Sequence, residues 1–123
     1  MDPDDLSENK CFTYTWNIEN FSYSWQKNRE CISSPVFNVD TMEKTKWRLD
    51  LYPNGCLKNA RDYISFFLKR ESACTGPEEF NIYFDLSFLT TNTSALLSRG
   101  PYSNSFSKGM DWGLVRFVPL DQY

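Results

Sequence analysis

Apolar and polar residues alternate along much of this chain, most clearly between residues 46 and 52. There Trp47, Leu49 and Leu51 are separated by polar or mixed residues, which is the two-residue period of a β-strand with one buried face. The segment ends at Pro53-Asn-Gly55, where proline fixes φ and Asn and Gly tolerate positive φ, so a sharp turn is expected. Strands that end in such turns are typical of β-sandwiches and barrels, so the pattern favours an antiparallel all-β fold.

The same period predicts further strands on both sides of this segment. They cover residues 12–18, 31–39, 63–70, 80–88 and 112–118. Pro35 lies inside the 31–39 segment, which implies an edge position or a bulge.

The remaining segments read as connections. Residues 20–28 carry three aromatic anchors, Phe21, Tyr23 and Trp25, and residues 90–93 form a polar loop. Residues 94–99 fit either a helical turn or a short strand, which Gly100-Pro101 then breaks. Residues 103–109 are polar and loop-like apart from Phe106.

The two faces of the 63–70 segment differ. Ile64, Phe66 and Leu68 form an apolar face, whereas Tyr63 and Phe67 lie on a mixed one. These two aromatics fit the partly covered second face of a sandwich strand, or the wall of a shallow groove. The pair Lys69-Arg70 reads as a solvated strand end.

Length and charge exclude several functions. The chain has 123 residues, enough for one domain with its own core, and a net charge of −3 with no run of basic residues. It therefore lacks the clustered positive charge that proteins use to bind nucleic acids or anionic membranes. Residues 1–10 are acidic and polar, unlike a signal peptide, and read as a disordered lead-in. No stretch approaches the ~20 apolar residues of a membrane span.

Cysteine usage indicates a reducing compartment. Cys11, Cys31, Cys56 and Cys74 have wide spacings without Cys-x-x-Cys, and histidine is absent, so a zinc site is not expected. With no export signal, all four are expected as unpaired thiols in an intracellular protein, nuclear or cytoplasmic. Two sequons, at Asn20 and Asn92, point the other way but arise often by chance.

No catalytic constellation is present, and neither an enzyme nor a cofactor is expected. The absence of histidine removes Ser-His-Asp and Cys-His chemistry. Asp50, Asp85 and Asp111 could meet in space as paired carboxylates, but Asp50 and Asp85 alternate with core residues and are most simply the solvent-facing side of strands. Asp111 precedes Trp112 and Gly113, whose missing Cβ would let another backbone approach closely; Asp111 could equally cap a turn.

Four segments in order carry a family resemblance. They are Tyr14-Thr-Trp16-x-Ile18-x-x-Phe21, Trp47-x-Leu-x-Leu-Tyr-Pro-Asn-Gly55, Asp62-Tyr-x-Ser-x-Phe-Leu68 and Gly109-x-Asp-Trp-Gly113-x-x-x-Phe117. Together they resemble a MATH (meprin and TRAF homology) domain, with the nearest likeness to the substrate-binding domain of speckle-type POZ proteins. The resemblance implies an antiparallel β-sandwich of the TRAF-C/MATH type over residues 11–123, without cofactor or metal.

The resemblance also implies a function. Such domains bind Ser/Thr-rich unstructured peptides as an added strand in a shallow groove, and a following BTB/POZ domain, absent here, recruits a cullin-RING ubiquitin ligase. Carried over by position, the groove aromatic falls on Phe67 and the Asp-Trp-Gly step on residues 111–113. The family's groove Phe, the Phe after the step and the Lys before it are replaced here by Ile82, Leu114 and Met110. The expected peptide-binding residues are Phe67, Ile82, Tyr102, Phe106, Met110, Asp111, Trp112, Gly113 and Leu114.

These positions lead to specific expectations. Phe67 and Trp112 should line one concave surface with Asp111 at its rim. The family's sandwich has a further strand beyond Tyr123, so this chain is expected to lack its last strand, to be marginally stable and to self-associate through exposed edges. Two alternatives remain: an extracellular MATH-type domain with disulfides, and a carbohydrate-binding sandwich that stacks sugars on exposed Tyr and Trp.

Overall fold

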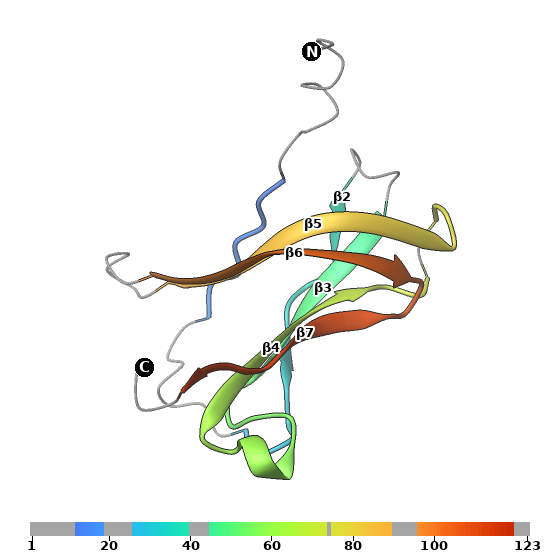
Figure 1. The fold of residues 1–123 in the computed structure, drawn as a ribbon. Helices are drawn as coiled ribbons and strands as arrows, with labels where there is room; N and C mark the ends of the chain where they lie inside the picture. The colour runs from blue at the N-terminus through green and yellow to red at the C-terminus, as the bar shows by residue number, and fades with distance from the viewer. Residues whose placement is uncertain (1–11, 19–25, 40–44, 74, 90–95, 120–123) are drawn as a thin grey trace.

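A computed structural model describes residues 12–18, 26–39, 45–73, 75–89 and 96–119 (Figure 1). The described residues form seven strands and one short 3-10 helix, η3 (Lys58–Ala60). The strands are β1 (Ile32–Ser33), β2 (Phe37–Val39), β3 (Thr45–Tyr52), β4 (Tyr63–Arg70), β5 (Glu79–Leu89), β6 (Leu96–Ser107) and β7 (Asp111–Pro119).

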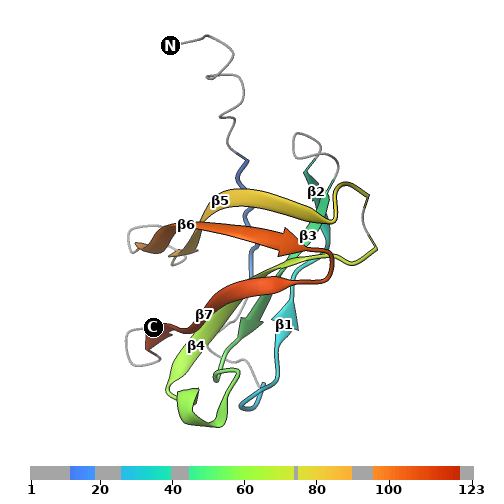
Figure 2. The same cartoon turned by 45° about the vertical axis from the view of Figure 1, so that its right-hand side comes forward.

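The strands form two antiparallel sheets. The larger has the order β1-β3-β4-β7, with β2 also paired to β3, and the smaller consists of β5 and β6. Figures 1 and 2 show the β5–β6 pair lying across one face of the larger sheet, so that the inner faces of both sheets enclose the core. The antiparallel β-sandwich predicted from the sequence is therefore confirmed.

The core lies between these inner faces. Trp47 of β3 meets Phe106 of β6 edge-on, with ring centroids 5.1 Å apart, and Phe66 meets Phe117 at 5.2 Å. Each such buried side chain contributes roughly 1.5–3 kcal/mol through removal of apolar surface from water. Among the described residues, the buried side chains of this core cluster are Val39, Trp47, Leu51, Ile64, Phe66, Leu68, Ile82, Leu86, Phe106, Phe117 and Val118.

Alternation predicted most of the strands correctly. The segments expected at 46–52, 63–70, 80–88 and 112–118 correspond to β3, β4, β5 and β7. The segment 31–39 is divided at Pro35 into β1 and β2, which both pair with β3, so its edge position is confirmed. The predicted turn after β3 is also present: the Gly55 N–H donates to the Tyr52 carbonyl at 3.1 Å, with φ +84° at Gly55.

The strand expected at residues 12–18 is not found among the paired strands. This segment pairs with no described strand, although its alternation is real: Tyr14, Trp16 and Ile18 are half-buried and the residues between them are exposed. Trp16 and Ile18 pack against the core, while Tyr14 stacks on Phe37 at 4.0 Å. One-sided burial thus accounts for the alternation, and no ladder joins this segment to any strand that the structure describes.

The expected break at Gly100-Pro101 is wrong, because β6 runs through it and on to Ser107; of the loop expected at 103–109, only residues 108–109 form a turn. Phe84 pairs with Tyr102 and Leu86 with Arg99, so Gly100 and Pro101 together oppose the single residue Asp85. This is a β-bulge, and Gly100 allows it with φ +130°, a region that L side chains rarely adopt.

The expectation for Arg70 is also wrong: the sequence favours a solvated strand end, but the side chain is fully buried. Its guanidinium donates to the carbonyls of Phe106 at 2.9 Å, Pro77 at 2.6 Å and Glu78 at 3.3 Å. Its Nε has no partner among the described residues. Arg70 therefore joins β4 of the larger sheet to β6 of the smaller one through main-chain acceptors.

Several predictions fall outside the described residues. They concern the acidic lead-in, the aromatic anchors Phe21, Tyr23 and Trp25, and the polar loop at 90–93.

Candidate functional site

β7 is the strand that carries the Asp-Trp-Gly step, and a tight turn aligns it with β4. The Arg70 N–H donates to the Met110 carbonyl at 2.9 Å, and the Gly109 N–H donates to the Arg70 carbonyl at 2.9 Å. In an antiparallel ladder, successive residues alternate between facing the partner strand and facing away from it. The main-chain groups of Trp112 and Leu114 therefore face β4, while those of Asp111 and Gly113 face the opposite edge.

That opposite edge of β7 is unpaired in the part of the chain that the structure describes. The larger sheet ends at β7, and β6 pairs with β5 instead of β7 (Figure 2). An edge strand presents free N–H and C=O groups that can pair with another chain. In the regular part of β7, before the register shift that follows Leu114, these groups belong to Asp111 and Gly113.

On the inner side of β7, three rings gather where the two sheets meet. Trp112 is half-buried, with ring centroids 4.7 Å from Tyr102 and 5.5 Å from Phe84, and Phe84 lies 5.8 Å from Tyr102. We call Phe84, Tyr102 and Trp112 the aromatic trio. It brings two predicted site residues together from β6 and β7.

On the outer side of β7, a different set of side chains surrounds Gly113. Phe67 is directly opposite Gly113 in the register, and exposed Asp111 is opposite Lys69. The Phe67 ring is half-buried and packs edge-on against Tyr52, at 5.9 Å. Because Gly113 has no side chain, the backbone of β7 is open beside the Phe67 ring.

The expectation that Phe67 and Trp112 line one surface is therefore wrong. Trp112 is opposite Leu68, which is buried in the core, whereas Phe67 is opposite Gly113. Residues directly opposite each other point to the same face of a sheet, so Phe67 and Trp112 point to opposite faces. The two aromatics lie on either side of one edge strand.

Gly113 itself is required by the sheet. A Cβ at this position would collide with the Phe66 carbonyl oxygen and lie 2.5 Å from Phe67 Cα. The close backbone approach inferred from the sequence is thus the approach of β4 to β7.

The remaining predicted site residues divide between surface and core. Met110 and Leu114 are half-buried and pack against the core. Phe106 is 0% exposed and Ile82 8% exposed, which places both inside the sandwich. Phe84 was not among the predicted site residues, although the alternation of residues 80–88 puts it on the same face as Ile82.

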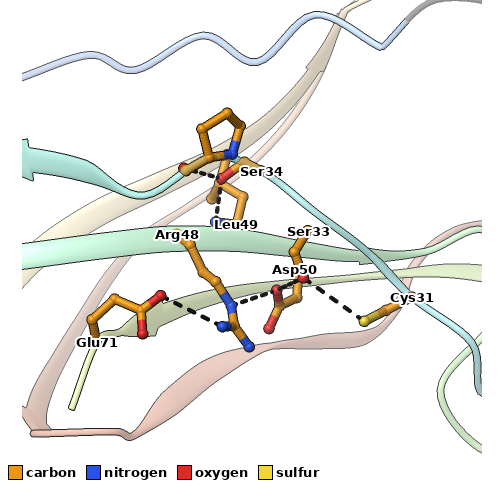
Figure 3. A network of polar contacts seen from close by, with 8 residues as sticks. Cys31, Ser33, Ser34, Arg48, Leu49, Asp50 and Glu71 are labelled. Atoms are coloured by element: carbon orange, nitrogen blue, oxygen red, sulfur yellow. Dashed lines mark hydrogen bonds and ion pairs between the residues drawn. The ribbon is translucent and has the colours of Figure 1, made fainter. Parts of the chain in front are cut away.

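A polar network covers the outer face near the opposite edge of the same sheet (Figure 3). Asp50, expected on a wet face, is only 4% exposed, because the Ser33 hydroxyl donates to it at 2.7 Å and Arg48 Nε at 3.0 Å. Arg48 also reaches Glu71 at 3.5 Å. The hydrogen bond to Asp50 raises the pKa of Arg48.

Tyr52 lies beside this network. Burial, followed by the neighbouring Cys31 and Asp50, raises the pKa of Tyr52 to about 12. Cys31 Sγ lies 4.0 Å from Ser33 Oγ. Cys31 and Cys56 are both free thiols, while Cys11 and Cys74 lie outside the described residues.

The described part of the chain holds no group of three or more metal-ligating side chains placed to bind an ion. It also contains no helix with the length and apolar character needed to cross a membrane.

Comparison with known proteins agrees with this architecture. A family model of the MATH domain matches residues 13–122. TD and POZ domain-containing protein 3 of Mus musculus is 39% identical over 66 residues, which are 54% of this chain and 18% of that protein. MATH domains are interaction modules and do not form an enzyme family. The match over nearly the whole chain shows that this protein belongs to the MATH domain family and is a protein-interaction module.

Proposed function

We propose that this domain binds Ser/Thr-rich unstructured peptides by adding them as a strand to the free edge of β7. The observation that carries the proposal is the unpaired edge at Asp111 and Gly113, with different side chains on its two sides. Main-chain hydrogen bonds to these two residues would supply affinity, and the side chains of alternate peptide residues would supply specificity.

The two sides of the edge favour a particular peptide pattern. A side chain that points to the inner side of the sheet meets the half-buried rings of Tyr102 and Trp112 and the apolar Leu114. A side chain that points to the outer side meets Phe67, Asp111 and Lys69, where hydroxyls can hydrogen-bond. An extended peptide that alternates apolar residues with Ser or Thr therefore fits both sides.

We further propose that the domain is the substrate-recognition part of a BTB/POZ-type adaptor for a cullin-RING ubiquitin ligase, in the nucleus or cytoplasm. A relative whose name includes a POZ domain supports this role, and the free thiols Cys31 and Cys56 are consistent with a reducing compartment. The ligase would be engaged through a BTB domain, which the described residues do not contain.

Isothermal titration calorimetry with Ser/Thr-rich peptides tests peptide binding. Trp112→Ala should weaken binding by about 2 kcal/mol or more, or roughly thirty-fold, because anchor aromatics carry much of an interface's affinity. Tyr83→Ala is the matched control: Tyr83 is 83% exposed on β5, in the other sheet, and its loss should leave affinity unchanged.

Since Trp112 also packs against the core, a second variant separates binding from folding. Phe67→Ala removes a half-buried ring on the outer side of the sheet and should also weaken the peptide. If folded Trp112→Ala and Phe67→Ala proteins both bind with the wild-type affinity, the peptide does not use this edge.

A further inference from the structure

The free edge of β7 is not uniform along its length. Phe117, near the end of the strand, also faces the free edge, but its carbonyl already has a donor: Arg99 Nη2 of β6 lies 3.3 Å from the Phe117 oxygen. An added strand would lie only ~4.8 Å from β7, so the Arg99 guanidinium occupies the space that the strand would need there.

A bulge in β7 separates Phe117 from the regular part of the edge. Ile64 pairs with Val118, and Phe66 pairs with Leu114, so residues 115–117 of β7 all oppose the single residue Ser65. The fully buried Ser65 hydroxyl donates to the Val115 carbonyl at 2.6 Å and accepts from the Cys56 N–H at 3.0 Å. The Val115 carbonyl is therefore turned towards β4 and is not offered to an incoming strand.

The other end of the edge is limited by the turn before β7. The Met110 N–H donates to the Ser107 carbonyl at 3.0 Å, and Gly109 has φ +83°, so the chain leaves the strand direction immediately before Asp111. Within the regular part of β7, only Asp111 and Gly113 therefore have main-chain N–H and C=O groups that point away from β4 and remain open to a bound strand.

We propose that this arrangement fixes the register of the bound peptide, and that Arg99 is the residue that stops the added strand from extending along Phe117. The inference rests on the proposed peptide-binding function. The peptide pairs with Asp111 and Gly113 and ends at the bulge, so a segment of about five residues, ~17 Å when extended, saturates the main-chain contacts.

Arg99 is suited to this role by its position. It is opposite Leu86 in the β5–β6 register, immediately before the Gly100-Pro101 bulge, and it reaches from the smaller sheet to β7 of the larger one. A guanidinium donates a charge-assisted hydrogen bond, which a neutral peptide N–H would have to displace.

A peptide length series tests the proposal. Ser/Thr-rich peptides of about four to ten residues are titrated into the full chain by calorimetry. For the wild type, affinity should stop rising at about five residues. For Arg99→Ala, it should continue to rise by about fivefold for the next pair of main-chain hydrogen bonds.

The matched control is Arg116→Ala. Arg116 is a neighbouring exposed arginine on β7 whose guanidinium donates to the Asn59 carbonyl at 3.0 Å. This variant removes the same charge without freeing the Phe117 carbonyl, so its affinity should level off at the wild-type length.

Amide hydrogen exchange in the wild type gives a second measurement that depends on no variant. A ten-residue peptide should protect the Asp111 and Gly113 amides and leave the Phe117 amide unprotected. Protection of Phe117 in the wild type, or the same limiting length in wild type and Arg99→Ala, would overturn the role of Arg99 while peptide binding stands. If no peptide binds and neither Asp111 nor Gly113 is protected, the proposed function fails and the register proposal fails with it.

Discussion

The two edges of the larger sheet are built differently. At one edge, β1 and β2 are strands of two and three residues, and Pro35 lies between them. At the other edge, β7 is a strand of nine residues whose proline is its last residue, Pro119. Short strands and prolines are the usual means by which proteins prevent an edge from pairing with another chain.

At the break between β1 and β2, Ser34 takes over the pairing with β3. The Ser34 N–H donates to the Leu49 carbonyl at 2.8 Å, and the Ser34 hydroxyl accepts from the Leu49 N–H at 2.9 Å. Ser34 alone therefore pairs with both main-chain groups of Leu49 in β3 where β1 and β2 are interrupted. At β7 the corresponding outward groups of Asp111 and Gly113 have no described strand beside them. Among the described strands, this sheet therefore has one short edge interrupted by proline and one long edge with a regular stretch that is unpaired.

Gly113→Ala should have the largest effect on the open edge. The added methyl group would collide with the Phe66 carbonyl oxygen, so β7 would have to move away from β4. We expect a loss of about 3 kcal/mol in the free energy of unfolding, at the upper end of overpacking effects, measured by urea denaturation.

Gly109→Ala provides the control for this variant. Its Cβ would meet only Ser72 Cβ at 3.4 Å, although its φ of +83° carries some backbone strain. The expected loss is about 1 kcal/mol. Equal losses for the two glycines would contradict the close approach of β4 and β7.

Pro35→Thr tests the β1–β2 edge. Threonine supplies an N–H and favours extended backbone, so β1 and β2 could join into a longer strand beside β3. Stability should fall by about 1 kcal/mol or less, since removing proline mainly frees the unfolded chain. Sedimentation velocity should show more dimer than for the wild type at equal concentration; an unchanged monomer would mean that Pro35 does not guard this edge.

The pH dependence of stability tests the packing beside the β1–β2 edge. The pKa of Tyr52 is raised to about 12 from its ordinary value of 10.0, chiefly by burial. Between these values the unfolded chain releases the proton and the folded chain keeps it. The contribution of Tyr52 to stability is therefore complete below pH 10 and is lost as pH rises towards 12.

Tyr52→Phe should remove this part of the alkaline loss in denaturation experiments at a series of pH values. An identical alkaline profile for the variant would show that Tyr52 is not held in the packed position beside Cys31 and Asp50.

The sequence predicted the fold well where alternation and sheet pairing coincide. β3, β4, β5 and β7 each have one continuous buried face, and a period of two is enough to find them. The sequence left residues 94–99 as either a helical turn or a short strand and favoured a loop at 103–109, because Gly100-Pro101 normally ends a strand. Only the register with Asp85 shows that a bulge absorbs these two residues within β6. Residues 12–18 show the reverse case, a strand pattern without a partner strand among the described residues.

The candidate site was only partly predictable, because it depends on which residues oppose each other. The sequence pointed to Asp111, Trp112, Gly113 and Phe67 as candidates. It could not show that Trp112 and Phe67 lie on opposite faces of the sheet, because that follows from the β4–β7 register. The burial of Asp50 and Arg70 was also missed. It arises from Ser33 and Arg48 around Asp50, and from main-chain carbonyls far along the chain around Arg70.

Residue-resolved hydrogen exchange, with and without a saturating Ser/Thr-rich peptide, tests the central claim most directly. The account predicts slower exchange at the Asp111 and Gly113 amides, because a bound strand would occupy their hydrogen bonds, and no change at the amides of β1 and β2. Protection along β1 and β2 with none at Asp111 or Gly113 would contradict it, since the peptide would then pair with the edge that Pro35 interrupts.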